Sequence, residues 1–212
     1  MNEMNLFEQF LYYYRINGSY IFEQFMRHFL LSIEGVLLAA IVGIPLGILI
    51  ARYHKLSDWV IGVANVIQTI PSLAMMSIIM LVAGLGARTV IITVFLYSLL
   101  PIIKNTYTGM QTLDPNIMDA SKGIGMTSFQ RLRLVELPLS MSVIMAGIRN
   151  ALVVAIGIVA IGSFIGSGGL GDIIIRGTNA TDGGGNYFSR GYPHSPNGDY
   201  YRYIPRCYSK KV

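Results

Sequence analysis

Four long apolar stretches constrain this chain more than any other feature of its sequence. They cover about residues 28–51, 59–85, 89–103 and 139–165. A helix needs roughly 20 apolar residues to cross the hydrocarbon core of a bilayer, and only the third stretch is shorter than that. Each stretch is continuously apolar, without the alternation that the strands of a membrane barrel require. The sequence therefore predicts an all-α membrane protein with four spanning helices.

The composition excludes several other classes of function. Charged residues make up 13% of the chain, about half of what a soluble domain carries. One cysteine excludes a disulfide framework or a Cys-based metal cluster within the chain, and the three histidines have no metal-ligand spacing. Most of the net charge of +5 lies after residue 182, so a basic surface for nucleic acid is not supported. We expect no cofactor and no metal in this chain, and no nucleic-acid partner.

The residues before the first stretch predict an interfacial helix. Residues 1–27 are rich in Phe and Tyr, which suit a helix lying at the membrane surface. Glu3 and Glu8 stand where a signal peptide would have its basic region, so no signal peptide is expected.

Basic residues predict the orientation in the membrane. They gather after the first stretch and between the third and the fourth, at Arg52, Lys55, Lys104, Lys122, Arg131 and Arg133. Both connections lie on one side if all four stretches cross, and the positive-inside rule makes that side cytoplasmic. The N-terminus is then predicted outside.

The connection 104–138 is the long polar segment between spans, and its signals predict two short helices. Asp114 before Pro115 is an N-cap followed by proline at the first helical position. Gly123 and Gly125 are expected to end that helix, because glycine accepts the left-handed conformation found at helix ends.

A second start signal follows in the same connection. Thr127 and Gln130 have the spacing of a capping box, and Pro138 is expected to stop the second helix where the fourth span begins. On these signals alone, the helix pair is either a connector or a docking element for a soluble partner.

The same connection resembles the EAA motif of the permease subunits of ABC importers. The motif has an acidic residue, two small residues, a glycine six positions after the acid, and a closing apolar-x-Leu-Pro. The matching residues are Asp119, Ala120, Ser121, Gly125, Val135, Leu137 and Pro138. This chain has Asp119 for the usual Glu, Ser121 for the second Ala, and Val135 for the usual Ile.

The resemblance implies a fold, a function and a set of partners. The fold would be the MetI-like helical bundle with a cytoplasmic coupling-helix loop at 104–138. The chain would be a transport subunit in the membrane of a bacterial cell and not an enzyme. A pair of ATPase subunits, a second permease subunit (the same or a homologous chain) and an extracytoplasmic substrate-binding protein would complete the importer.

The run 68–74 in the second stretch narrows the resemblance to importers of compatible solutes such as glycine betaine, carnitine and choline. Gln68, Thr69 and Ser72 cluster around Pro71, which removes a backbone hydrogen bond and loosens the helix. This polar turn either lines the translocation path or is a kink satisfied by neighbouring helices. A permease for another small solute, such as an amino acid, is the alternative.

Two charged residues fall inside predicted spans. Glu34 follows Arg27 by seven residues, or about 10 Å of helix, so it can reach an interface. Arg149, beside Asn150, lies near the middle of the fourth stretch. A charge in the membrane is costly, so Arg149 either lines a cavity or seats against another span.

The glycines at 166, 168 and 171 satisfy GxGxxG but do not predict a dinucleotide site. A membrane helix precedes them where a soluble strand is required, and no acidic residue follows about 20 positions later. They are expected to form a flexible turn on the outer face.

Residues 183–212 differ in character from the rest of the chain, with six Tyr and no apolar run. The family would place one more span there, and the neighbouring reading frame is compatible with an apolar helix. The tail is therefore read either as frameshifted or as a natural basic tail, disordered as written. A chain lacking that span could also be a non-transporting membrane component. A membrane-embedded enzyme is the remaining rival, although the spans supply no convincing catalytic group.

Overall fold

A computed structural model describes residues 6–179, and this part of the chain is helical without any strand. The predicted tail at 183–212 lies outside the described residues. Ser19–Ala180 form one compact unit, to which the packing below belongs. Residues 6–18, which are helical, belong to a second unit. The elements are α1 (Leu6–Arg52), α2 (His54–Thr69), α3 (Ser72–Ala83), α4 (Ala87–Gln111), α5 (Pro115–Gly123), α6 (Ser128–Arg131), a π-helical turn η1 (Leu132–Glu136), α7 (Leu137–Gly162), a 3₁₀ turn η2 (Ser163–Ile165) and α8 (Leu170–Asn179).

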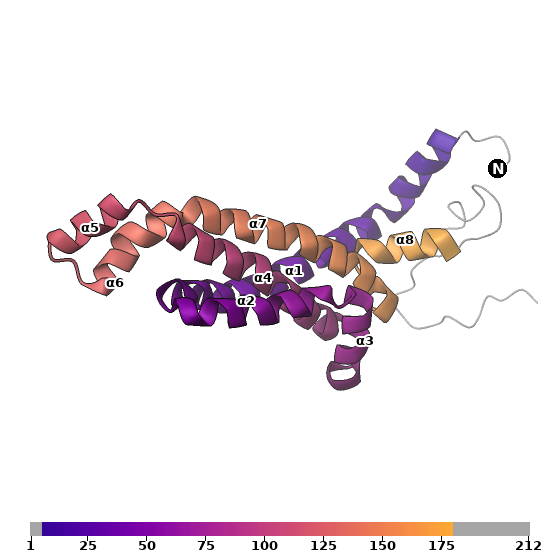
Figure 1. The fold of residues 1–212 in the computed structure, drawn as a ribbon. Coiled ribbons are helices and arrows are strands. Elements are labelled where there is room, and N and C mark those ends of the chain that lie inside the picture. The colour runs from indigo at the N-terminus through magenta and orange to yellow at the C-terminus, as the bar shows by residue number, and fades with distance from the viewer. Residues whose placement is uncertain (1–5, 180–212) are drawn as a thin grey trace, which may run out of the picture. The chain divides into compact units, whose positions relative to one another are not determined.

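Helices α4 and α7 form the centre of the bundle and run side by side in opposite directions (Figure 1). Small residues set their separation: a Cβ added to Gly147 would lie 2.8 Å from the carbonyl oxygen of Pro101, and one on Gly109 3.2 Å from the Cβ of Ser140. In lipid, helices associate through close packing of this kind because burial from water contributes little.

Helix α1 packs along α4 through a second set of glycines. Gly35 lies against Val94 and Gly43 against Ile102. A Cβ on Gly47 would stand 2.6 Å from that of Thr106. The paired numbers increase together, so α1 and α4 run parallel and the chain between them must return across the bundle.

The returning segment is broken into two helices. Helices α2 and α3 meet at an angle of 97° (Figure 1). Pro71 has no N–H to continue the helix, and Ile70 before it is extended, with φ −73° and ψ 128°. The stretch predicted as a span at 59–85 is therefore a bent pair, as the kink at Pro71 indicated, and not one straight helix.

Three helical segments of the described chain are long and apolar enough to cross a membrane, and the bent α2–α3 pair would be a fourth. The first of them is Leu11–Arg52. It continues without a break past residue 27, where the sequence predicted a change from an interfacial helix to the first span. No helix-breaking residue stands at position 27, and the preceding Gly18 is tolerated inside the helix.

The connection after α4 confirms two predicted helix starts and corrects one predicted stop. Helix α5 begins at Pro115 with Asp114 as its N-cap, and the capping box of Thr127 and Gln130 is formed in both directions. Pro138 was expected to end a helix, but the chain stays helical from Ser128 to Gly162. The π-turn η1 widens the helix just before Pro138, which accommodates a residue without an N–H.

Candidate functional site

The turn after α5 depends on one glycine. The N–H of Gly125 donates to the carbonyl of Lys122 at 2.9 Å, and that of Met126 to the carbonyl of Ser121 at 3.2 Å. Gly125 has a φ of +79°, in the left-handed region that other residues rarely occupy. Its position is open to solvent, because an added Cβ would meet nothing within 4 Å. The glycine is thus required by the backbone and not by crowding.

The residues of the EAA-like motif divide into an exposed set and a packed set. Asp119 and Ala120 are exposed on α5, and Asp119 pairs with Lys122 at 2.9 Å. Ser121 is buried and donates to the carbonyl of Met118 at 2.7 Å. Val135 and Leu137 are half-buried, whereas Pro138 is exposed. One part of the motif therefore faces outward while the other packs.

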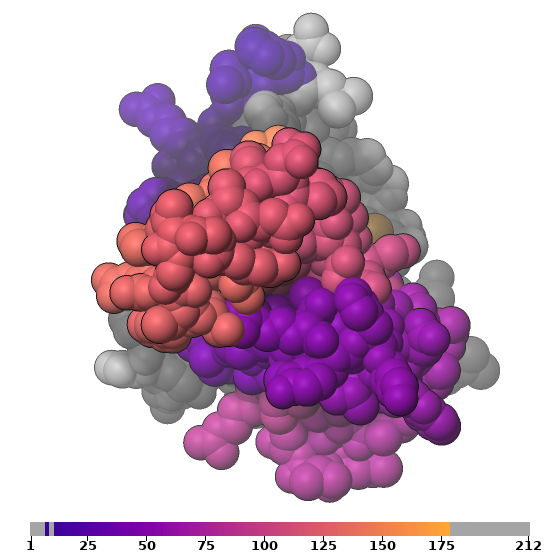
Figure 2. Space-filling model, turned by 60° about the vertical axis from the view of Figure 1, so that its left-hand side comes forward, coloured from indigo at the N-terminus to yellow at the C-terminus, as the bar shows by residue number. Residues whose placement is uncertain are grey.

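Apolar side chains surround the exposed part of the motif. The loop bears four exposed large ones: Ile117, Ile124, Phe129 and Leu134. Ile124 and Phe129 are 74% and 70% exposed. Figure 2 views the end of the molecule at which α5 and α6 form a protruding surface beside α2. Exposed apolar groups outside the spans are typical of a surface that another protein covers.

A buried carboxylate ties this loop to the end of α1. Glu136 is 4% exposed and accepts from Arg131 Nε at 3.0 Å and from an Arg52 guanidinium nitrogen at 3.4 Å. The same nitrogen of Arg52 contacts the carbonyl of Ser128 at 3.3 Å. We call Arg52, Arg131 and Glu136 the ionic clamp. In the sequence, the two arginines indicate only the orientation of the chain, and Glu136 has no predicted role, since no local pattern joins residues 84 positions apart.

The predicted path residues stand at the break between α2 and α3. The amide of Gln68 donates to the carbonyl of Tyr97 at 2.8 Å, and the Tyr97 hydroxyl donates to the carbonyl of Ile70. These bonds satisfy backbone groups near the break, so Gln68 has a structural role there. Tyr97 was not singled out from the sequence, although an aromatic hydroxyl inside an apolar span was a signal for it.

The other three predicted path residues lie toward the surface of the chain. The Thr69 hydroxyl donates to the carbonyl of Val66 at 2.7 Å and is exposed, as is Pro71. Ser72 is half-buried. This surface remains available to the path or to a neighbouring subunit.

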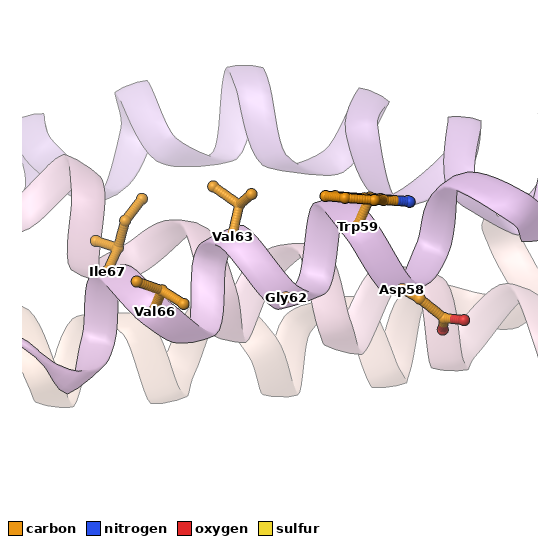
Figure 3. A pocket seen from close by; sticks show the side chains of 6 residues that line it. All are labelled: Asp58, Trp59, Gly62, Val63, Val66 and Ile67. Atoms are coloured by element: carbon orange, nitrogen blue, oxygen red, sulfur yellow. The ribbon is translucent and has the colours of Figure 1, made fainter.

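An open hollow of about 490 Å³ lies along α2 and does not include the predicted path residues. It is lined by Asp58, Trp59, Gly62, Val63, Val66 and Ile67 (Figure 3). Trp59 and Val63 point to the same side of α2, and Trp59 is 77% exposed. Its almost wholly apolar lining suits contact with lipid or another helix and not with a hydrophilic solute.

At the far end of the bundle, α1 holds the glycine-rich turn. The N–H of Gly169 donates to Gln24 Oε1 at 2.7 Å, and that of Leu170 to His28 Nδ1 at 3.3 Å. Nδ1 accepts a hydrogen bond here, so His28 Nε2 carries the hydrogen and donates to the carbonyl of Ile156 at 3.1 Å. We call Gln24, His28 and the N–H groups of Gly169 and Leu170 the glycine-turn clamp. The turn was expected to be flexible, but buried side chains hold it.

A carboxylate extends this contact to α8. Asp172 accepts hydrogen bonds from the Tyr20 hydroxyl of α1 and from Arg176, the latter at 2.7 Å. Burial alone would raise the pKa of Asp172, but these two hydrogen bonds and the charge of Arg176 together lower it.

Most of the chain matches a known protein family. The model of the binding-protein-dependent transport system inner membrane component matches residues 43–189.

Curated relatives are similar over most of the chain. The glycine betaine/carnitine/choline transport system permease protein OpuCD of Bacillus subtilis is 64% identical over 85% of this chain and 79% of its own. The carnitine transport permease protein OpuCD of Listeria monocytogenes is 60% identical, over 85% and 81%. The choline transport system permease protein OpuBD of Bacillus subtilis is 62% identical, over 85% and 80%.

Among solved structures, a chain from inward-facing structures of the MetNI methionine ABC transporter has a similar fold. Its TM-score is 0.67 at 19% identity, over 76% of this chain and 81% of that one. This likeness establishes the helical fold.

Proposed function

The chain belongs to the family of binding-protein-dependent transport system inner membrane components, and we propose that its solute is a small quaternary-ammonium osmolyte such as glycine betaine, carnitine or choline. It is a multi-pass membrane protein and a transport subunit of an ABC importer, with ATP hydrolysis on a separate subunit. The observation that carries the solute proposal is the identity of 64% with a permease named for these three compounds.

The loop from α5 to η1 is proposed as the element that couples the chain to its ATPase. The exposed Asp119, Ala120 and apolar side chains would contact the ATPase, while Ser121 and Glu136 anchor the loop within the chain. A rigid helix pair transmits the motion of a partner to the spans, whereas a floppy loop would absorb it. The caps on α5 and α6 support such rigidity.

The loop end is proposed to be cytoplasmic, which places the N-terminus of the first span outside. Arg52 contacts the loop directly, so the basic residues after the first span and those of the loop lie at one end of the bundle. This shared position supports the positive-inside argument, because both basic connections would otherwise face opposite sides.

Solute is proposed to pass near the break between α2 and α3, along Thr69, Pro71 and Ser72, with Gln68 holding the break in shape. Thr69 and Pro71 are exposed on this chain, so a second permease subunit of the same or a homologous sequence would complete the path. Two ATPase subunits and an extracytoplasmic substrate-binding protein would complete the importer, the latter docking near the glycine-rich turn.

Uptake of labelled glycine betaine by cells with this subunit deleted or restored tests the solute. Restored uptake supports the proposal. Uptake of another small solute, such as an amino acid, with none of betaine, carnitine or choline, would overturn it.

A matched pair of glycine variants tests the coupling loop. Gly125→Val forces a β-branched residue into φ +79°, at a cost of about 1–2 kcal/mol, and should abolish transport while the protein still reaches the membrane. Gly123→Ala is the control, because Gly123 ends α5 with open space around its Cβ position and no left-handed φ. Normal transport by Gly125→Val would contradict the assignment of this loop as the element that couples the chain to its ATPase.

A further inference from the structure

Arg149 lies at the middle depth of the bundle. It follows Gly147, whose Cβ position is 2.8 Å from the carbonyl of Pro101, and Pro101 lies near the centre of α4. Arg149 is likewise near the centre of α7. A charge at this depth is far from both membrane surfaces.

Asn150 is exposed on the flank of α7, about 100° round the helix from Arg149, which is exposed on the side that turns away from α4. Gly147 and Ala151, on the opposite side, are buried. Within residues 6–179, neither Arg149 nor Asn150 has an ion pair or hydrogen bond from its side chain. Its own span neighbours therefore do not neutralise this arginine.

The other charge within a span does not compensate it. Glu34 is exposed on α1 next to Gly35, which lies against Val94. Val94 precedes Pro101 on α4 by seven residues, or about 10 Å along the helix. Glu34 and Arg149 thus lie at different depths, and an ion pair between them within one chain is not formed.

An arginine in this position must face water or an opposite charge. A charged side chain in the hydrocarbon core is costly, and such residues face cavities or partners. The break between α2 and α3 is at a similar depth, because Gln68 bonds the carbonyl of Tyr97, about 6 Å from Pro101 along α4. Two polar features at one level of the bundle favour a solute path there over contact with lipid.

We propose that Arg149, with Asn150, contacts the carboxylate of a zwitterionic solute during its passage. The guanidinium of Arg149 and the amide N–H groups of Asn150 are hydrogen-bond donors that match carboxylate oxygens, and the guanidinium would repel a quaternary ammonium group. Glycine betaine and carnitine carry such a carboxylate, whereas choline does not. The assignment rests on the proposed function, since it names the part of the solute that this chain recognises.

Cysteine labelling tests whether this side of α7 is in water. In a Cys207→Ser background the chain has no other cysteine. Asn150→Cys and the exposed Met145→Cys and Val153→Cys should react with a charged, membrane-impermeant thiol reagent in the assembled transporter. Val159→Cys, buried in the core, is the unreactive control. If Asn150→Cys is as unreactive as the control, α7 faces lipid or protein there and the proposal fails.

Uptake by charge variants tests the carboxylate. Arg149→Gln should lower glycine betaine uptake about tenfold or more, while choline uptake and assembly with the ATPase subunits persist. Arg149→Lys should lie between, because it keeps the charge without the planar fork. Equal loss for both solutes, or loss of assembly, would show that Arg149 pairs with another subunit and overturn the proposal.

Transport by the wild type separates the proposed solute class from the proposed role of Arg149. If the wild-type transporter carries none of these solutes, the proposed function is wrong, and the carboxylate assignment falls with it even where Asn150→Cys is labelled. If it carries choline but no carboxylate-bearing solute, the function stands and the role of Arg149 is overturned.

Discussion

Helix α1 is fixed to the rest of the bundle at two points by different chemistry, at its C-terminal end and near its middle. At the loop end, Arg52 reaches Glu136 at 3.4 Å through a guanidinium that is 37% exposed. Near the middle of α1, Gln24 and His28 are buried and accept hydrogen bonds from backbone N–H groups of the glycine-rich turn. The ionic clamp is thus charged and partly open to solvent, whereas the glycine-turn clamp is neutral and enclosed.

The difference indicates which contact can change during transport. The half-exposed contact of Arg52 with Glu136 can break and re-form at low cost, because water solvates Arg52 while Glu136 keeps its more enclosed pair with Arg131. Buried N–H groups that lose their acceptors cost more and have no such substitute. We therefore expect the loop end to shift relative to α1 more readily than the glycine-rich turn does.

The largest effect on stability is expected from Glu136→Gln. The change leaves Arg131 and Arg52 without their carboxylate and should destabilise the subunit by about 2 kcal/mol, less than for a fully buried pair because Arg52 is partly exposed. The thermal stability of the purified transporter measures it. Lys122→Gln, which breaks only the exposed pair with Asp119, should change little. Equal shifts in both variants would contradict a special role for Glu136.

A somewhat smaller effect is expected from Gln24→Ala. The N–H of Gly169 then lacks its acceptor, which costs about 1–2 kcal/mol. Hydrogen exchange at Gly169 and Leu170 should become faster while exchange in α5 stays unchanged. The adjacent Glu23→Ala is the control, since Glu23 is exposed. Unchanged exchange in Gln24→Ala would show that the turn is held by its own backbone.

Salt should weaken the ionic clamp by roughly a few tenths of a kcal/mol and leave the glycine-turn clamp unchanged. Raising ionic strength screens the charges of the ionic clamp but not the neutral glycine-turn clamp. Thermal stability of the wild type should therefore fall slightly with salt, and Glu136→Gln should lose that dependence. A dependence that persists in Glu136→Gln would place its origin elsewhere.

Acid should have the smallest effect, through Asp172 beside the glycine-turn clamp. Its pKa in the folded protein is below the ordinary value of 3.8, so its contribution to stability is present above that value and lost as pH falls through the lowered pKa. Asp172→Asn should be less sensitive to acid in that range. Identical acid profiles for both proteins would remove Asp172 from the contact with α1.

Local chemistry explains what could be predicted from the sequence. The N-cap at Asp114 and the capping box at Thr127 depend on residues within three positions, and both are found where expected. The apolar stretches predicted the helical membrane fold for the same reason. The kink at Pro71 was also expected, although not the full break of 97°.

Contacts between distant residues explain what was missed. Glu136 meets Arg52, and His28 meets Leu170, across 84 and 142 positions, and a single sequence contains no pattern that joins them. Pro138 was read as a stop because its missing N–H usually ends a helix. The π-turn before it depends on packing that the sequence does not display.

That uninterrupted helical segment from Ser128 to Ile165 has a mechanical consequence. Its 38 residues extend for about 57 Å, from the loop to the turn that leads into α8. It can act as a lever arm: a tilt of about 5° around one end would displace the other by about 5 Å. A small movement of α6 by an ATPase would thus displace the turn at the opposite end of the segment, without any change of secondary structure in between.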